Sequence, residues 1–415
     1  MKSYLVLLCF FCSTALCAQA LRENAPKIFV DCQWWCDEDY LKTELAYLNF
    51  VRDRAVADVF VQQTALSTGS GGLQFTLMFL GQKQWSGQND TLSFALPPAA
   101  SDEQQRQGMK KNLERGLLPY LLKTSLADLI SFQITAPANP DQKPAEDPWN
   151  YWTFSARANL ETQGQEAARS FWFNGSLVAQ RVTERQKTRV YGQFELNRNR
   201  FQLEDGKTEV YGQGGWRIGA SQVMAINDHW SYGLAANLGQ SQYRNQKRSA
   251  VFEPGLEFNV FPFREAATRQ LAFRYGAGLQ HNRYFQETIF FKTRELLWRQ
   301  SLSATYRQVM NWGAFNMGFR AGNYLHDWSL HAVNLSGGFE LNVFKGFRFH
   351  FYGDFSLLHN QVELSNGGAT PQEVYLRVRQ LKTNYNYYVW CGVSYTFGSI
   401  YSNVVNQRFT GEEGY

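Results

Sequence analysis

The chain lacks any long hydrophobic run after its first 20 residues. No later stretch approaches the 18 consecutive apolar residues that make a segment a candidate membrane-spanning helix. Mean hydropathy is negative, at −0.40. These two properties argue against a helical membrane protein. They are compatible with a transmembrane β-barrel, because barrel strands carry apolar residues only at alternate positions.

Cysteine is also scarce, with six residues in 415. Three of them belong to the N-terminal leader, and Cys32, Cys36 and Cys391 remain. Cys32 and Cys36 form either a local disulfide or two free thiols, and both alternatives remain open. Export would place the pair where disulfides persist. A zinc site is disfavoured, because zinc takes four ligands and only Asp31 and Asp37 stand nearby. No metal or cofactor site is therefore expected.

The sequence has no basic cluster and no nucleic-acid recognition motif, so a nucleic-acid partner is not expected. Charge is divided along the chain. Residues 21–148 hold 12 basic and 16 acidic residues, whereas residues 149–415 hold 28 basic and 20 acidic residues. A basic second part suits contact with phosphorylated membrane lipid. The glycine-rich stretch 69–72 lacks the lysine and following helix of a phosphate loop, and is interpreted as a hairpin tip.

The first 20 residues are expected to form a secretory signal peptide. Lys2 is the only charge, Leu5 to Phe11 form the apolar segment, and Ala18-Gln19-Ala20 matches a cleavage site. The mature chain is expected to begin at Leu21. A lipoprotein leader fits less well, because Leu16 precedes Cys17 where a small residue is needed.

Residues 21–135 predict a small α/β domain. Ile28–Val30 is a short strand, and a helix is expected over residues 37–57, where Leu41, Leu45, Leu48 and Val51 recur at helical spacing. Strands follow over 58–66, 73–80 and 91–96. Ser101 and Gln104 form a capping box that opens a second helix. Residues 136–148 carry four prolines among acidic and small residues, which predicts an extended linker.

From Trp149 to about residue 399 the sequence alternates between apolar and polar residues. In Phe347 to Leu357, one face would carry phenylalanines and a leucine, and the other Arg348, His350 and Asp354. The pattern predicts an antiparallel transmembrane β-barrel of about 12 strands, rather than a soluble sandwich, because the apolar faces hold almost no charge and aromatic residues gather at strand ends. The expected strands start near Tyr151, Ser170, Arg189, Val210, Trp230, Val251, Leu271, Leu296, Phe315, Leu330, Phe347 and Val374.

The polar faces would line the lumen with eight arginines and five acidic residues. We predict as lumen-facing charges Arg157, Arg189, Glu195, Arg217, Glu253, Glu257, Arg274, Arg299, Arg307, Arg320, Glu340, Arg348 and Asp354. Paired charges would satisfy one another in a closed interior. Surplus arginine would instead favour anions in a narrow path. Both interpretations remain open at this point.

The final segment Tyr388 to Gly398 alternates and is rich in aromatic residues. With this last segment, the region from Trp149 to about Ser399 resembles bacterial outer-membrane β-barrel proteins, whose alternating, aromatic-rich last strand acts as an assembly signal. The chain departs from that pattern because residues 400–415 continue beyond the strand. The resemblance implies an outer-membrane location, with the N-terminal domain in the periplasm.

Connections of two lengths agree with this orientation. Tight turns are expected at residues 184–187, 227–229, 311–313 and 345–346, on the periplasmic side. Longer loops are expected at residues 161–168, 198–208, 285–292 and 365–373, on the outer side. The short 326–329 loop and the longer 262–269 turn depart from the rule.

Three functions are compatible with these features. The leading hypothesis is an outer-membrane protein that passes solutes or organises the envelope, with its periplasmic domain contacting a protein partner. A closed structural barrel is the first alternative. A lipid hydrolase is the second, because His229 and Ser231 share a strand face and outer-membrane phospholipases use such a pair. Ser231 is not followed by the Asn-Gly of those enzymes, although Ser365-Asn366-Gly367 occurs elsewhere, so no catalytic residue is assigned.

Overall fold

The structure is a computed structural model of the 415-residue chain. It describes residues 25–32, 36–69, 71–131, 147–202, 207–310, 312–344, 347–367 and 380–399. The predicted signal peptide, most of the predicted linker and the C-terminal extension lie outside these residues. In the described part of the chain, no helix is both long and apolar enough to cross a membrane.

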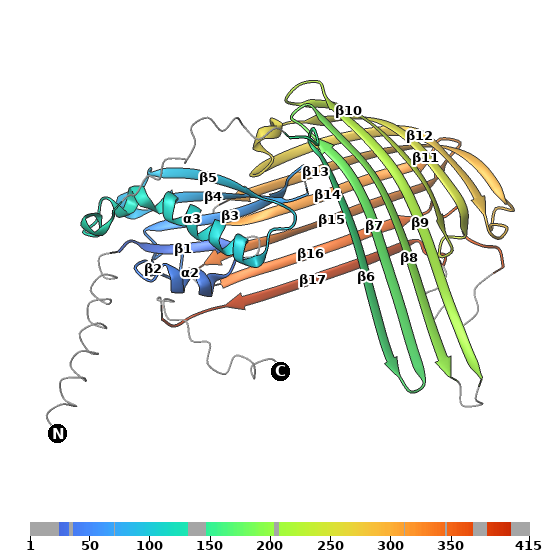
Figure 1. Cartoon of the computed structure of the whole chain (residues 1–415). Coiled ribbons are helices and arrows are strands. Elements are labelled where there is room, and N and C mark those ends of the chain that lie inside the picture. The colour runs from blue at the N-terminus through green and yellow to red at the C-terminus, as the bar shows by residue number, and fades with distance from the viewer. Residues whose placement is uncertain are drawn as a thin grey trace. The chain divides into compact units, whose positions relative to one another are not determined.

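In the described residues between 25 and 131, the N-terminal region is a five-stranded sheet with helices α2 and α3 (Figure 1). The sheet order is β2-β1-β3-β4-β5, with β1 parallel to β2 and β3, and β3, β4 and β5 antiparallel. Its elements are β1 Lys27–Cys32, α2 Glu38–Glu44, β2 Asn49–Phe50, β3 Val59–Ser67, β4 Leu73–Gly81, β5 Asn89–Leu96 and α3 Asp102–Leu121, with short 3-10 turns η1 Lys83–Trp85 and η2 Ala127–Leu129. The predicted mixed α/β region is confirmed.

The predicted helix over residues 37–57 is wrong beyond its first two turns. Asp37 caps α2 by accepting from the Tyr40 amide, but the helix ends at Glu44. Residues Asn49 and Phe50 instead extend the sheet by parallel pairing with β1. Leu45 and Leu48 are still buried, in a turn rather than on a helix face. Long-range strand pairing overrides the helical spacing here.

One apolar core holds the N-terminal region together. Ile28, Val61 and Leu77 of the sheet are fully buried with Leu113 and Leu117 of α3. The capping box of α3 is confirmed: the Gln104 amide donates to the Ser101 hydroxyl and the Ser101 amide donates to the Gln104 side chain. A disulfide joins Cys32 at the end of β1 to Cys36 just before α2.

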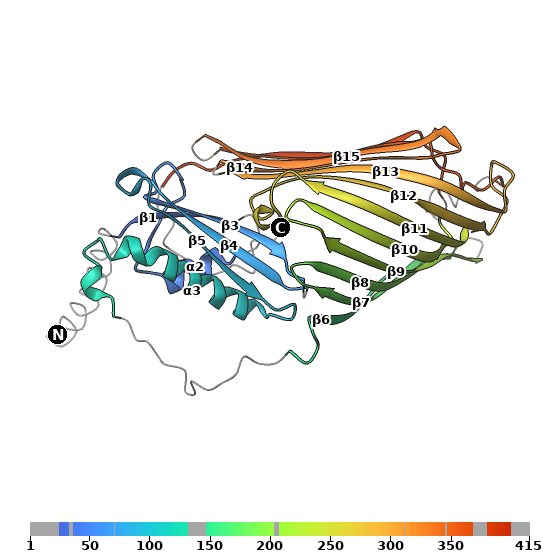
Figure 2. The same cartoon turned by 90° about the horizontal axis from the view of Figure 1, so that it is seen from above.

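The second part of the chain is a twelve-stranded antiparallel sheet in which each strand pairs with its neighbours in sequence. Figure 2 shows the strands following one another from green to red around a curved sheet. They are β6 Trp152–Gln165, β7 Ala168–Val182, β8 Gln186–Gln202, β9 Thr208–Ala225, β10 Trp230–Ser241, β11 Gln246–Asn259, β12 Arg269–Tyr284, β13 Arg294–Met310, β14 Gly313–Tyr324, β15 Asp327–Phe344, β16 Phe347–Leu358 and β17 Tyr385–Tyr395, with the 3-10 turn η3 Phe263–Glu265 before β12. The predicted strand number and antiparallel class are confirmed.

The connections depart from the predicted pattern at one end of the sheet. The expected loop over residues 161–168 is wrong, because β6 continues to Gln165 and β7 begins at Ala168. The polar residues there belong to strands that extend beyond the alternating apolar segment. The tight connections after β7 and β9 and the long β12–β13 loop are present. The predicted strand start at Val374 lies outside the described residues, and the last described strand begins at Tyr385.

Two compact units divide the chain. Among the described residues, 341–344, 347–349 and 393–399 group with the N-terminal region, and the other described residues between 147 and 392 form the second unit. The candidate site described below lies entirely within the second unit.

Candidate functional site in the lumen of the sheet

The two faces of the twelve-stranded sheet differ in chemistry. One face exposes large apolar side chains, including Ile218 (54 % exposed), Leu296 (60 %) and Leu302 (47 %). The residues that alternate with them, such as Arg217 and Ser301, line cavities on the other face. A water-soluble sheet has no reason to expose its apolar face along successive strands, whereas a sheet in lipid does. This is the architecture of an outer-membrane β-barrel.

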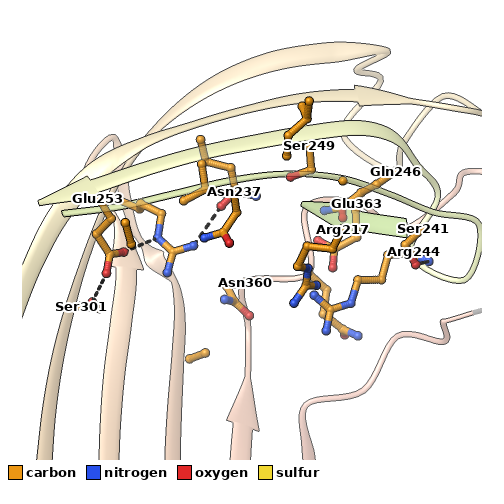
Figure 3. Close-up of a pocket in the computed structure, with 18 of the residues that line it drawn as sticks. Arg217, Asn237, Ser241, Arg244, Gln246, Ser249, Glu253, Ser301, Asn360 and Glu363 are labelled. Atoms are coloured by element: carbon orange, nitrogen blue, oxygen red, sulfur yellow. Dashed lines mark hydrogen bonds and ion pairs between the residues drawn. The ribbon is translucent and has the colours of Figure 1, made fainter. Parts of the chain in front are cut away.

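A cavity of about 580 Å³ lies on the polar face (Figure 3). It is lined by strands β8 to β16, by the β10–β11 turn and by described residues between β16 and β17. Its charged lining residues are five arginines and two glutamates: Arg217, Arg244, Arg274, Arg299, Arg320, Glu253 and Glu363. Four of the predicted lumen arginines are thus brought together with predicted Glu253.

Glu253 on β11 is shared by two arginines. Its carboxylate lies 3.6 Å from the Arg274 guanidinium and 3.3 Å from that of Arg299. Arg299 also donates to the Gln280 side chain at 3.2 Å. The Ser301 hydroxyl lies 3.5 Å from the same carboxylate. A shared carboxylate balances one of the two positive charges, so the group retains a net positive charge.

Arg217 on β9 and Arg244 in the β10–β11 turn form no ion pair within 4.0 Å among the residues that the structure describes. Figure 3 shows both guanidinium groups turned into the same space, near Glu363 and Asn360. Arg244 was not predicted, because the period-two alternation that identifies lumen residues is a property of strands and does not extend to turns. A basic residue in a short turn at the lumen rim was the available signal.

The connection after β16 folds into the lumen. Asn360, Gln361 and Glu363 line the cavity, and they directly precede the outer loop expected over residues 365–373. Val362 is 2 % exposed and packs with Leu297 and Tyr324 in a small apolar cluster. Residues 359–367 are called the inner loop below.

The inner loop is fastened to two neighbouring loops. The Asn245 side chain donates to the carbonyl oxygen of Glu363 at 3.1 Å, and the Ile289 amide donates to that of Leu364 at 2.8 Å. The Ser365 hydroxyl donates to the Gln286 side chain at 2.6 Å. Because these bonds come from separate connections, the inner loop holds a fixed position in the lumen.

The Glu363 side chain is half-buried, and desolvation of its carboxyl raises the pKa of Glu363. The nearby Arg244 charge and a hydrogen bond from the Gln380 side chain act in the opposite direction and do not cancel the effect. A protonated Glu363 leaves the Arg244 charge unopposed.

The remaining predicted lumen charges lie elsewhere on the sheet. Glu195 lines a second cavity of about 470 Å³. Asp354 accepts from Asn334 at 3.1 Å, Glu340 lies 3.9 Å from the His350 ring, and Arg348 donates to Asn342 at 3.1 Å. Arg157 is exposed on β6, the Arg189 guanidinium lies over the Tyr191 ring, Glu257 stands opposite Arg274 in the strand register, and Arg307 is half-buried on β13.

The candidate hydrolase pair is not assembled. The His229 Nδ1 atom lies 2.8 Å from the Asn259 carbonyl oxygen, and Ser231 is 4 % exposed. Among the described hydrogen bonds, none joins His229 to Ser231. Ser365 fastens the inner loop, as described above, and its hydroxyl also accepts from the Gly367 amide at 3.3 Å.

No protein-family model and no curated protein matches the sequence. Ten solved chains match in structure. A NanC porin is 10 % identical with a TM-score of 0.28, and the match covers 58 % of this chain and 99 % of that one. The CymD monoaromatic hydrocarbon channel is 10 % identical with a TM-score of 0.27, covering 69 % and 78 %. These scores are low, and the barrel assignment above rests on strand topology and on the chemistry of the two faces.

Proposed function

We propose that the chain forms a narrow, anion-preferring path for small solutes across the bacterial outer membrane. The observation that carries the proposal is the run of adjoining cavities on the polar face, lined by more arginine than acid. Fixed positive charge in a narrow passage attracts anions and repels cations. The exposed apolar face would meet lipid.

The N-terminal region is proposed to stand in the periplasm and to contact a protein partner. The predicted signal peptide and the Cys32–Cys36 disulfide both favour an exported, oxidising location. The chain enters β6 on one side of the membrane and returns to that side after every second strand. The tight connections after β7 and β9 therefore lie on the side where the chain enters β6.

The inner loop supports a narrow path rather than a wide pore. It occupies part of the lumen and is held by hydrogen bonds to two separate loops. A solute would pass between the inner loop and the wall formed by β9 to β11, where Arg217 and Arg244 lie.

A closed structural barrel is the second candidate. The sharing of Glu253 by Arg274 and Arg299 favours it, because such pairing also stabilises a plugged interior. The two candidates differ in one measurable property, which is ionic current.

The deciding experiment is single-channel recording from purified, refolded protein in planar lipid bilayers. The passage predicts discrete current steps, and a reversal potential in a KCl gradient that shows chloride preference. Arg217→Gln and Arg244→Gln should each reduce that preference. Arg157→Gln removes the same charge from a residue that lines neither of the two cavities, and should leave it unchanged. Folded protein without current steps would leave the closed barrel as the function.

A further inference from the structure

Arg217 and Arg244 stand where cavities meet. Both line the 580 Å³ cavity and the 470 Å³ cavity. Arg244 also lines a third, of about 350 Å³, together with Gln213, Glu363 and Gln380. The two guanidinium groups point into the same space (Figure 3), so a solute held there would contact both.

The size of these spaces exceeds what an inorganic ion requires. Cavities of about 300–1,000 Å³ are typical of sites that hold organic ligands, and the largest cavity here is about 580 Å³. Its lining contains amide and hydroxyl side chains, among them Asn237, Gln246 and Ser249. Such groups bind ligands that carry several hydrogen-bonding atoms.

Two buried acceptors beside Arg244 have no donor. The side-chain oxygens Oε1 of Gln213 and Gln380 are buried and lack a hydrogen-bond partner among the described residues. Gln213 lines the second and third cavities, and Gln380 the first and third. A buried acceptor without a donor is costly, and a ligand hydroxyl in the cavity would satisfy it.

We propose that Arg217 and Arg244 bind the acidic group of a small hydroxylated organic anion, whose hydroxyl groups donate to Gln213 and Gln380. Guanidinium groups suit carboxylate and phosphate equally, since both accept bidentate hydrogen bonds. The inference deepens the proposed function, on which it rests, by naming the class of solute and the place where it binds.

Titration calorimetry on the detergent-solubilised full chain tests the site. The probes are sodium gluconate for the carboxylate and glucose 6-phosphate for the phosphate, with sorbitol and sodium acetate as controls. Binding of gluconate or glucose 6-phosphate is expected. Sorbitol lacks the charge and acetate lacks the hydroxyls, so both should bind at least tenfold more weakly. The probe that binds more tightly identifies the acidic group.

Variants locate the site. Arg217→Gln and Arg244→Gln should each weaken binding about tenfold or more, the loss expected for one charge-assisted hydrogen bond. Gln213→Leu should weaken gluconate binding without changing the acetate response. Arg157→Gln is the matched control and should bind as the unaltered chain does. Arg217→Lys and Arg244→Lys keep the charge and should retain part of the affinity, which separates lost binding from lost folding.

Two results would overturn the site: no binding of either probe, or affinities unchanged in both glutamine variants. Equal affinities for acetate and gluconate would also overturn the proposed site, because the hydroxyl groups would then contribute nothing to binding. Bilayer currents recorded on the same preparations separate this inference from the proposed passage. Current without probe binding rejects only the site, and probe binding without current rejects only the passage.

Discussion

Leu302→Arg is the sharpest test of which face of the sheet meets lipid. Leu302 lies at the middle of β13 between Tyr275 of β12 and Ala321 of β14, and its side chain is 47 % exposed. Arginine on the lipid face at the bilayer midplane costs about 2–4 kcal/mol in barrel proteins. This corresponds to a folding equilibrium about 30-fold to 1,000-fold less favourable.

The adjacent residue provides the matched control. Ser301 is next in the chain, at nearly the same depth, but it lines the cavity and lies 3.5 Å from Glu253. Ser301→Arg adds the same guanidinium where cavity water and a carboxylate can solvate it. Arg274 and Arg299 already share that carboxylate, so repulsion adds a cost, but the total should stay below that of Leu302→Arg because water reaches the cavity.

Urea titration of folding into phosphatidylcholine vesicles, followed by tryptophan fluorescence, measures both free energies. Leu302→Ala separates the loss of the leucine side chain from the gain of charge. Equal costs for Leu302→Arg and Ser301→Arg, or a larger cost for Ser301→Arg, would refute the assignment of the two faces.

Three further outcomes are expected. Gly116→Ala should lower the stability of the N-terminal region by about 1–2 kcal/mol in chemical denaturation, because the added Cβ would lie 2.0 Å from the Phe79 ring. Gly108→Ala is the control: its added Cβ would come no closer than 3.0 Å to the Phe94 ring, so the loss of stability should be smaller. Reducing the Cys32–Cys36 disulfide should cost about 2 kcal/mol at most, measured by the thermal midpoint with and without reductant, because the closed loop is short. Anion preference in bilayer recordings should fall as pH rises, and Glu363→Gln should abolish that change.

The strands of the sheet were predictable because period-two alternation is a local property. Trp230 and Phe347 begin β10 and β16 as predicted, and most other strands start within a few residues of the expected position. In the alternating part of each strand, successive side chains enter two different environments, so every pair of neighbouring residues reports the same division. The even strand number followed from counting these segments.

The inner loop and Arg244 were not predictable on the same grounds. The inner loop enters the lumen because of hydrogen bonds to Asn245, Gln286 and Ile289, which belong to connections far away in the sequence. No local pattern in residues 359–367 specifies these partners. The helix over residues 37–57 failed for a related reason, since pairing with β1 decides the structure of Asn49 and Phe50.

Glu363 gives the lumen a charge that depends on pH. It faces Arg244 in the β10–β11 turn and Glu295 on β13, and it also interacts with Tyr284 of β12 and Tyr324 of β14. Desolvation raises its pKa above that of an exposed glutamate, so the carboxyl keeps its proton to a higher pH in the folded chain than in the unfolded chain. The stabilisation of the inner loop from this group is complete below the unfolded pKa and is lost as pH rises through the folded pKa.

Ionisation of Glu363 therefore has two consequences as pH rises. The new negative charge offsets Arg244, which lowers the preference for anions, and the buried charge weakens the seating of the inner loop. Reversal potentials in a KCl gradient over a series of pH values measure the first effect. The Glu363→Gln variant stays neutral at every pH and should keep the anion preference of the low-pH state throughout. Asn360→Asp adds a second carboxyl to the inner loop and should lower the anion preference already at neutral pH. A pH dependence that persists unchanged in Glu363→Gln would assign the titration to another lumen group and refute the role given to Glu363.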